Sequence, residues 1–76
     1  MALIRRMARI TKEKQSIHGE TDCCYSIVTD ATGARFLQLD TFGSKDRQIP
    51  GKVSQSLQFD RDAALQLTAI IEEVFR

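Results

Sequence analysis

Basic side chains gather in two parts of this sequence, and both groups suit contacts with phosphate. The first group lies near the N-terminus and consists of Arg5, Arg6, Arg9, Lys12 and Lys14. The second group lies between residues 34 and 52 and consists of Arg35, Lys45, Arg47 and Lys52. Elsewhere acidic side chains prevail, so that the net charge of the whole chain is only +1. A partner that carries phosphates would therefore meet these two regions.

Two aromatic residues, Phe36 and Phe42, lie beside the second basic group. The chain has four Phe, one Tyr and no Trp, and these two rings are the best candidates for stacking on bases. In a strand both would lie on the face opposite Leu37 and Leu39. If the leucines pack on a helix, we expect both rings to be exposed on the outer surface of the sheet. There they serve either base stacking or an ordinary protein contact.

Residues that suit catalysis or metal binding are scarce. His18 is the single histidine and lies in a polar stretch, where spacing assigns it no nucleophile or acid as a partner. Cys23 and Cys24 are adjacent, so on a strand they point to opposite faces and do not suit a disulfide. Free cysteines favour a reducing compartment. We therefore expect no enzyme, no metal and no other cofactor, and we expect a cytoplasmic protein.

The chain length predicts one domain, residues 1–76, without a membrane span. The N-terminal ten residues are apolar in part, but Arg5, Arg6 and Arg9 interrupt them, which excludes the apolar core of a secretion signal. A chain of 76 residues has a marginal core of its own unless a partner subunit covers more apolar surface. The length therefore favours a homodimer.

Alternating and β-branched residues predict four strands before a single helix. The expected strands cover residues 3–13, 23–29, 35–42 and 53–59. Gly33 suits the turn of a hairpin between the second and third of them. The sequence thus predicts an α+β fold, in which a four-stranded antiparallel sheet is followed by one C-terminal helix.

The C-terminal helix is predicted to begin after Asp60, a good N-cap residue, and Asp62 adds negative charge to its first turn. Its apolar residues cover an arc of roughly 140°, which is wider than one sheet contact needs. Leu65 lies outside even this arc. A second, symmetry-related helix would use the excess, which favours a homodimer formed through the helices. A single helix buried against its own sheet is the alternative.

The C-terminal half of the chain resembles a known family in the order of its motifs. Phe42 at a strand end is followed by Pro50-Gly51-Lys52, then Ser56-Leu57, then an acidic helix start from Asp62 to Leu67. This order resembles the positive cofactor four family of single-stranded-DNA-binding transcriptional coactivators and its small bacterial relatives. The resemblance implies a homodimer joined by its helices. It also implies curved sheets that present basic and aromatic side chains to unpaired strands.

Together these patterns predict a protein that binds single-stranded DNA, or unpaired RNA, with low sequence specificity, as a cofactor of transcription or of DNA metabolism. The low net charge favours an alternative from another class. In that alternative the chain is a small dimeric adaptor that binds another protein through its sheet face or through an exposed strand edge. Salt dependence separates the two, because counterion release accompanies binding to phosphates.

Overall fold

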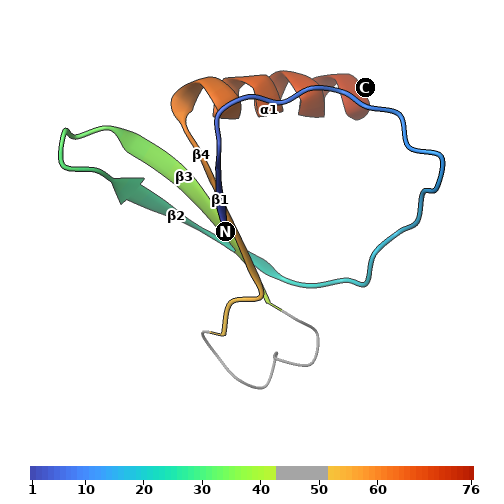
Figure 1. The fold of residues 1–76 in the computed structure, drawn as a ribbon, viewed down its shortest axis with the longest axis horizontal. Coiled ribbons are helices and arrows are strands. Elements are labelled where there is room, and N and C mark those ends of the chain that lie inside the picture. Colours follow the sequence, from blue (N-terminus) through green and yellow to red (C-terminus); the bar gives the residue numbers. More distant parts are fainter. Residues whose placement is uncertain (43–51) are drawn as a thin grey trace.

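The structure is a computed structural model of residues 1–76, and it describes residues 1–42 and 52–76. The chain folds into one four-stranded sheet and one helix, an α+β arrangement (Figure 1). The elements are β1 (Ala2–Ile4), β2 (Cys23–Thr29), β3 (Arg35–Thr41), β4 (Gln55–Phe59) and α1 (Arg61–Val74). The predicted order of strands before a C-terminal helix is therefore confirmed.

The sheet has the strand order β1-β4-β3-β2 and is mixed. The pairs β2–β3 and β3–β4 are antiparallel, as expected. In contrast, β1 pairs with β4 in parallel, with Ala2 opposite Leu57 and Ile4 opposite Phe59. The prediction of an all-antiparallel sheet was wrong at this edge. β1 and β2 run in the same direction at opposite edges, so the chain between them must lead from one edge to the other.

The first strand is much shorter than the predicted residues 3–13. It ends at Ile4, and residues 5–22 form no helix or strand. Its first part lies beside α1, where the Met7 N–H donates to Gln66 Oε1 at 3.1 Å, and Figure 1 shows the rest curving back to β2 at a distance from the sheet. The physical reason is the lack of alternation after Ile4. Arg5 and Arg6 follow each other directly, and a sheet offers no apolar contact to such a run.

A tight hairpin joins β2 to β3 without a bulge, since the register runs continuously from Cys23–Thr41 to Thr29–Arg35. Gly33 has a φ of 90°, which a residue without a Cβ adopts at little cost. The side chain of Asp30 accepts hydrogen bonds from the backbone N–H groups of Thr32 and Ala34 at 2.8 and 3.1 Å. The predicted turn is therefore confirmed.

Cross-strand register divides the side chains of the sheet between two faces. The helix-side face carries mainly apolar residues, namely Tyr25, Ile27, Leu37, Leu39, Leu57 and Phe59. The polar face carries Ser26, Phe36, Gln38, Asp40, Ser56 and Gln58. On the polar face the Gln58 Nε2 atom donates to Gln38 Oε1 at 2.8 Å, and Gln38 Nε2 donates to both oxygens of Asp40 at 3.2 Å.

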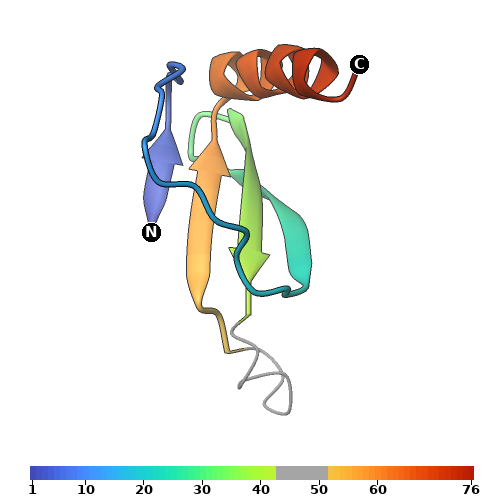
Figure 2. The ribbon, with the colours of Figure 1, turned by 90° about the vertical axis from the view of Figure 1, so that its right-hand side faces the viewer.

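The helix covers only one end of the helix-side face. Phe59 and Ala63 are the buried apolar residues in the part of the chain that the structure describes, with 4% and 0% of their surfaces exposed. Asp60 caps the helix as predicted, since its side chain accepts a hydrogen bond from the Ala63 N–H at 2.9 Å. Beyond its first two turns α1 extends away from the sheet (Figures 1 and 2).

Candidate nucleic-acid interface

A groove lies at the end of the sheet where β1 ends, α1 begins and the β2–β3 hairpin turns. Its volume is about 860 Å³. Three arginines from three different segments line it, namely Arg5 after β1, Arg35 at the start of β3 and Arg61 at the start of α1. Phe36 also lines it. We call this site the arginine groove.

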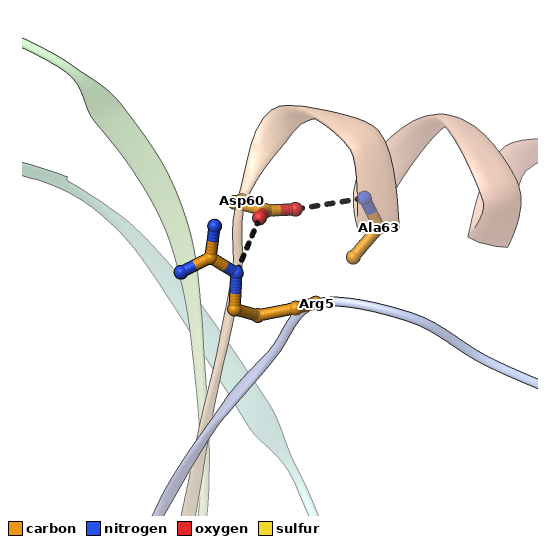
Figure 3. A network of polar contacts seen from close by, with 3 residues as sticks. All are labelled: Arg5, Asp60 and Ala63. Atoms are coloured by element: carbon orange, nitrogen blue, oxygen red, sulfur yellow. Dashed lines mark hydrogen bonds and ion pairs between the residues drawn. The ribbon is translucent and has the colours of Figure 1, made fainter.

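Asp60 organises the arginine groove from its centre. One of its carboxylate oxygens, Oδ2, lies 3.4 Å from Arg5 Nε, and the other accepts the capping hydrogen bond from Ala63 (Figure 3). The Arg5 side chain remains 77% exposed, so this ion pair adds little to stability. The Asp60 N–H also lies 3.5 Å from the Ile4 carbonyl oxygen, to which it donates, so the end of β1 lies beside the N-terminus of α1.

The other two arginines of the groove are less constrained. Arg35 and Arg61 are exposed, and neither forms an ion pair within residues 1–42 and 52–76. A guanidinium group presents planar donors that match the oxygens of a phosphate. The two side chains are therefore available to an anionic ligand at this end of the sheet.

Acidic residues share the groove with the arginines. Asp30, Asp60 and Asp62 all line it. The hydroxyl of Thr32 donates to Asp30 at 2.6 Å, and this bond, together with the backbone N–H donors of the turn, lowers the pKa of Asp30 below its ordinary value. Asp30 therefore stays ionised, and its oxygens are occupied by the turn. The groove as a whole is balanced in charge rather than strongly cationic.

The structure brings some of the predicted binding residues together and separates others. Arg5, Arg35 and Phe36 meet along the arginine groove. Lys52 is exposed at the opposite end of the sheet, before β4. The remaining basic residues of the N-terminal group are all exposed on the segment between β1 and β2, namely Arg6, Arg9, Lys12 and Lys14. Lys45 and Arg47, with Pro50 and Gly51, lie outside the described residues.

The prediction that the rings of Phe36 and Phe42 are exposed was wrong. Phe36 and Phe42 are half-buried rather than open on the outer surface. They also lie at opposite ends of β3, with Phe36 in the groove and Phe42 just after the strand, where its carbonyl accepts a hydrogen bond from Thr21 Oγ1. Phe36 is opposite Val28 in the register of β2 and β3.

Sequence reasoning missed two residues of interest. Tyr25 is 77% exposed on the helix-side face, which makes it the most open aromatic ring of the sheet. Arg61 adds a third guanidinium to the groove. No local pattern marked Tyr25, because its exposure follows from the place of β2 at the edge of the sheet. Arg61 could not be found from sequence, because it joins the groove only when the start of α1 packs beside the β2–β3 hairpin.

We also searched the described part of the chain for a metal site, a disulfide and a membrane span. No group of three or more His, Cys, Asp or Glu side chains there is placed to hold a metal ion. Cys23 and Cys24 are free and exposed. Among the described residues, none of the helical segments has the length and hydropathy of a membrane span.

Comparisons with known proteins add no family to these observations. No protein-family model matches the chain, and no match was found among curated proteins or solved structures. The resemblance to the positive cofactor four family stays a prediction from sequence motifs. Function must therefore be argued from the groove and the surfaces around it.

Proposed function

We propose that this protein binds single-stranded DNA, or unpaired RNA, with low sequence specificity, and serves as a cofactor in transcription or another step of DNA metabolism. The observation that carries the proposal is the arginine groove. Arg5, Arg35 and Phe36 were predicted from sequence as separate binding residues, and in the fold they line one groove together with Arg61. Guanidinium groups that gather at one end of a sheet suit the phosphates of a nucleotide chain.

The N-terminal segment supports the same function. Arg6, Arg9, Lys12 and Lys14 are exposed and follow directly from Arg5 in the groove. Exposed lysine and arginine side chains hold a phosphate backbone without reading its sequence. Residues 5–14 thus extend the cationic surface beyond the groove, although the groove itself is balanced in charge.

Duplex recognition fits this fold less well. A helix that reads the major groove presents polar and basic residues along one exposed face. α1 instead carries Asp62, Glu72 and Glu73 and an apolar stripe that is turned partly toward the sheet. Single strands, which an open groove admits without such a helix, are therefore the preferred substrate.

We also propose that the protein works as a homodimer. The chain alone exposes 7101 Å², whereas a compact folded chain of 8.6 kDa would expose about 4,700 Å². Its radius of gyration is 14.5 Å, against about 11 Å for a compact chain of this length. A stable interface of ordinary size covers about 800 Å² on each partner, and exposed apolar side chains of α1 and β2 contribute to the area that one could cover.

The outer part of α1, residues 68–74, is the surface we assign to this dimer. Ile70 and Val74 continue the line of the buried Ala63 along the helix, yet they lie beyond the sheet and are exposed. On the helix-side face of the sheet, Tyr25 and Ile27 are also exposed. A second copy that presents its own α1 would cover both apolar surfaces at once.

An adaptor that binds another protein is the second candidate. The three acids of the arginine groove and the low net charge favour it. In that case the uncovered Tyr25 and Ile27 would contact the protein partner. For either function we propose a cytoplasmic protein, because the adjacent cysteines are both free, and we propose no enzymatic activity.

Fluorescence anisotropy tests the nucleic-acid proposal. The probe is a labelled single strand of ~20 nucleotides, compared with its duplex and an RNA copy at low and moderate salt. We expect the single strand to bind more tightly than the duplex, and the affinity to fall steeply as salt rises. Equal affinity for the duplex would contradict the proposal, as would no binding at low salt.

Two charge-reversal variants test whether the single strand binds in the arginine groove. Arg35→Glu should weaken binding to the single strand by tenfold or more, which corresponds to about 1.4 kcal/mol. Arg76→Glu makes the same change in net charge at the exposed end of the chain, outside the groove. It should have a much smaller effect. Equal effects of the two variants would remove the argument for the arginine groove.

A further inference from the structure

The outer edge of β2 has no neighbour in the sheet. The strand order places β2 last, with β3 on its inner side, and in Figures 1 and 2 no other element lies along its outer side. β2 is seven residues long, and all of its residues except Val28 are exposed. It therefore forms the longer of the two free edges of the sheet.

The hairpin determines which backbone groups face this open edge. The N–H of Asp30 donates to the carbonyl of Ala34 at 3.0 Å, so these two residues form a hydrogen-bonded pair. In an antiparallel ladder bonded and non-bonded pairs alternate. Cys24, Ser26 and Val28 therefore bond to β3. The N–H and C=O groups of the alternate residues point outward, and these residues are Cys23, Tyr25, Ile27 and Thr29.

Protection of the kind that usually blocks a free edge is absent from β2. Charged residues, Pro, bulges and short length keep the edges of natural sheets from pairing with other chains. The sequence of β2 contains no charged residue and no Pro, and its register with β3 has no bulge. The opposite edge differs, because β1 has three residues and is followed by Arg5 and Arg6.

We propose that β2 pairs in antiparallel fashion with β2 of a second copy of this chain, which joins the two sheets into one. The register is centred on Ser26, which lies opposite Ser26 of the second copy. Tyr25 then lies opposite Ile27, and Cys23 lies opposite Thr29. All four of these residues direct their backbone groups outward, so both strands satisfy their hydrogen bonds over the full length of β2.

A second copy fits this edge better than an unrelated strand does. The seven residues of β2 are neutral. Two residues on each side of Ser26 direct their backbone groups outward, so two copies of the edge can bond to each other about a two-fold axis at Ser26. Tyr25 and Ile27, which are 77% and 58% exposed, would cover each other across the new pair. Aromatic and β-branched side chains make favourable cross-strand pairs.

This contact joins the edges of two β2 strands, whereas the proposed α1 interface centres on the outer helix, and Tyr25 and Ile27 border both contacts. Two interfaces of this symmetric kind on one chain join dimers into a closed tetramer or a longer row. A row of sheets would place successive arginine grooves along one strand of nucleic acid, which suits cooperative binding. The edge contact itself does not depend on nucleic-acid binding.

Cysteine crosslinking tests the register. In a chain with Cys23→Ser and Cys24→Ser, the thiol introduced by Ser26→Cys would face its own copy across a non-bonded pair, where side chains are closest. Mild oxidation should then give a covalent dimer in high yield. Ile27→Cys in the same background is the control, because its two copies would lie beyond the reach of a disulfide. No crosslink from Ser26→Cys, or equal yields from the two positions, would overturn the proposal.

A charge change gives a second test that leaves the strand intact. In the proposed register Asp22 lies opposite Asp30 of the second copy, just beyond each end of β2, and like charges in this position repel. Asp22→Lys should therefore raise the association constant by about fivefold or more, measured by sedimentation equilibrium. Glu20→Lys makes the same charge change outside the pair and should have a smaller effect. Equal effects of the two variants would contradict the register.

Discussion

The two ends of α1 carry the same apolar stripe but have different surroundings. In the first two turns Ala63 is completely buried against the end of the sheet. Ile70 and Val74 lie on the same side of the helix one and two turns beyond the sheet, and Val74 is 64% exposed. The contrast shows that an apolar stripe identifies a surface that needs cover, but not which molecule covers it.

The largest effect is expected where the inner part of the helix meets the sheet. Phe59→Ala should destabilise the fold by about 3–5 kcal/mol, because it removes a ring that is almost completely buried beside Ala63. Phe75→Ala removes the same ring at a position that is 81% exposed and should cost far less. Chemical denaturation followed by circular dichroism measures both. Similar losses would mean that the inner contact isn't the core of this fold.

The second prediction compares the two sides of α1 in their effect on self-association. Val74→Lys should weaken self-association at least tenfold, because it places a charge on the proposed dimer surface. Leu65→Lys is the matched control, since Leu65 is 58% exposed on the opposite side of the helix. Lys is a good helix former at both positions. Sedimentation of the two variants at matched concentrations measures the difference. A dimer that tolerates Val74→Lys would exclude this surface.

A smaller effect is expected at Asp60, where the end of β1 lies beside the start of α1. Asp60→Ala removes both the cap of α1 and the partner of Arg5, and it should cost about 1–2 kcal/mol of stability. Asp62→Ala, in the first turn, removes only a favourable charge near the helix N-terminus and should cost less than 1 kcal/mol. Thermal unfolding of the two variants gives the comparison. A loss for Asp62→Ala as large as that for Asp60→Ala would contradict the capping role.

The smallest effect concerns the hairpin and depends on pH. Hydrogen bonds from Thr32 and Ala34 hold the pKa of Asp30 below its ordinary value of 3.8 in the folded chain. The stabilisation by the ionised carboxylate is therefore present above pH 3.8 and is lost as pH falls through the lower folded value. Asp30→Asn should be less stable than the unchanged chain at pH 7, and this difference should shrink at the acidic end. A constant difference across this range would show that the charge of Asp30 plays no part.

Local pattern was sufficient to predict the elements that pack within the chain. The β2 bounds, the turn at Gly33 and the cap at Asp60 agree with the structure. Each depends on residues close together in the sequence, such as alternating side chains or a carboxylate three residues before the N–H that it caps. These features therefore need no knowledge of the tertiary fold.

The parts that sequence did not predict depend on contacts between distant segments. The parallel pairing of β1 with β4 joins residues 2–4 to residues 57–59, and no local pattern specifies such a partner. The arginine groove likewise forms from the ends of β1, the hairpin and the start of α1. For the same reason Tyr25 was overlooked, since its exposure follows from the place of β2 at the sheet edge and from the limited reach of the helix.

Sedimentation equilibrium of the unchanged chain tests the central claim most directly. The claim is that the outer helix and the helix-side face are covered by a second copy. We expect a mass of at least about 17 kDa, twice the 8.6 kDa of one chain, at micromolar concentrations and at moderate salt, because an apolar interface is insensitive to screening. A mass of 8.6 kDa at every concentration, with the chain folded, would contradict the account.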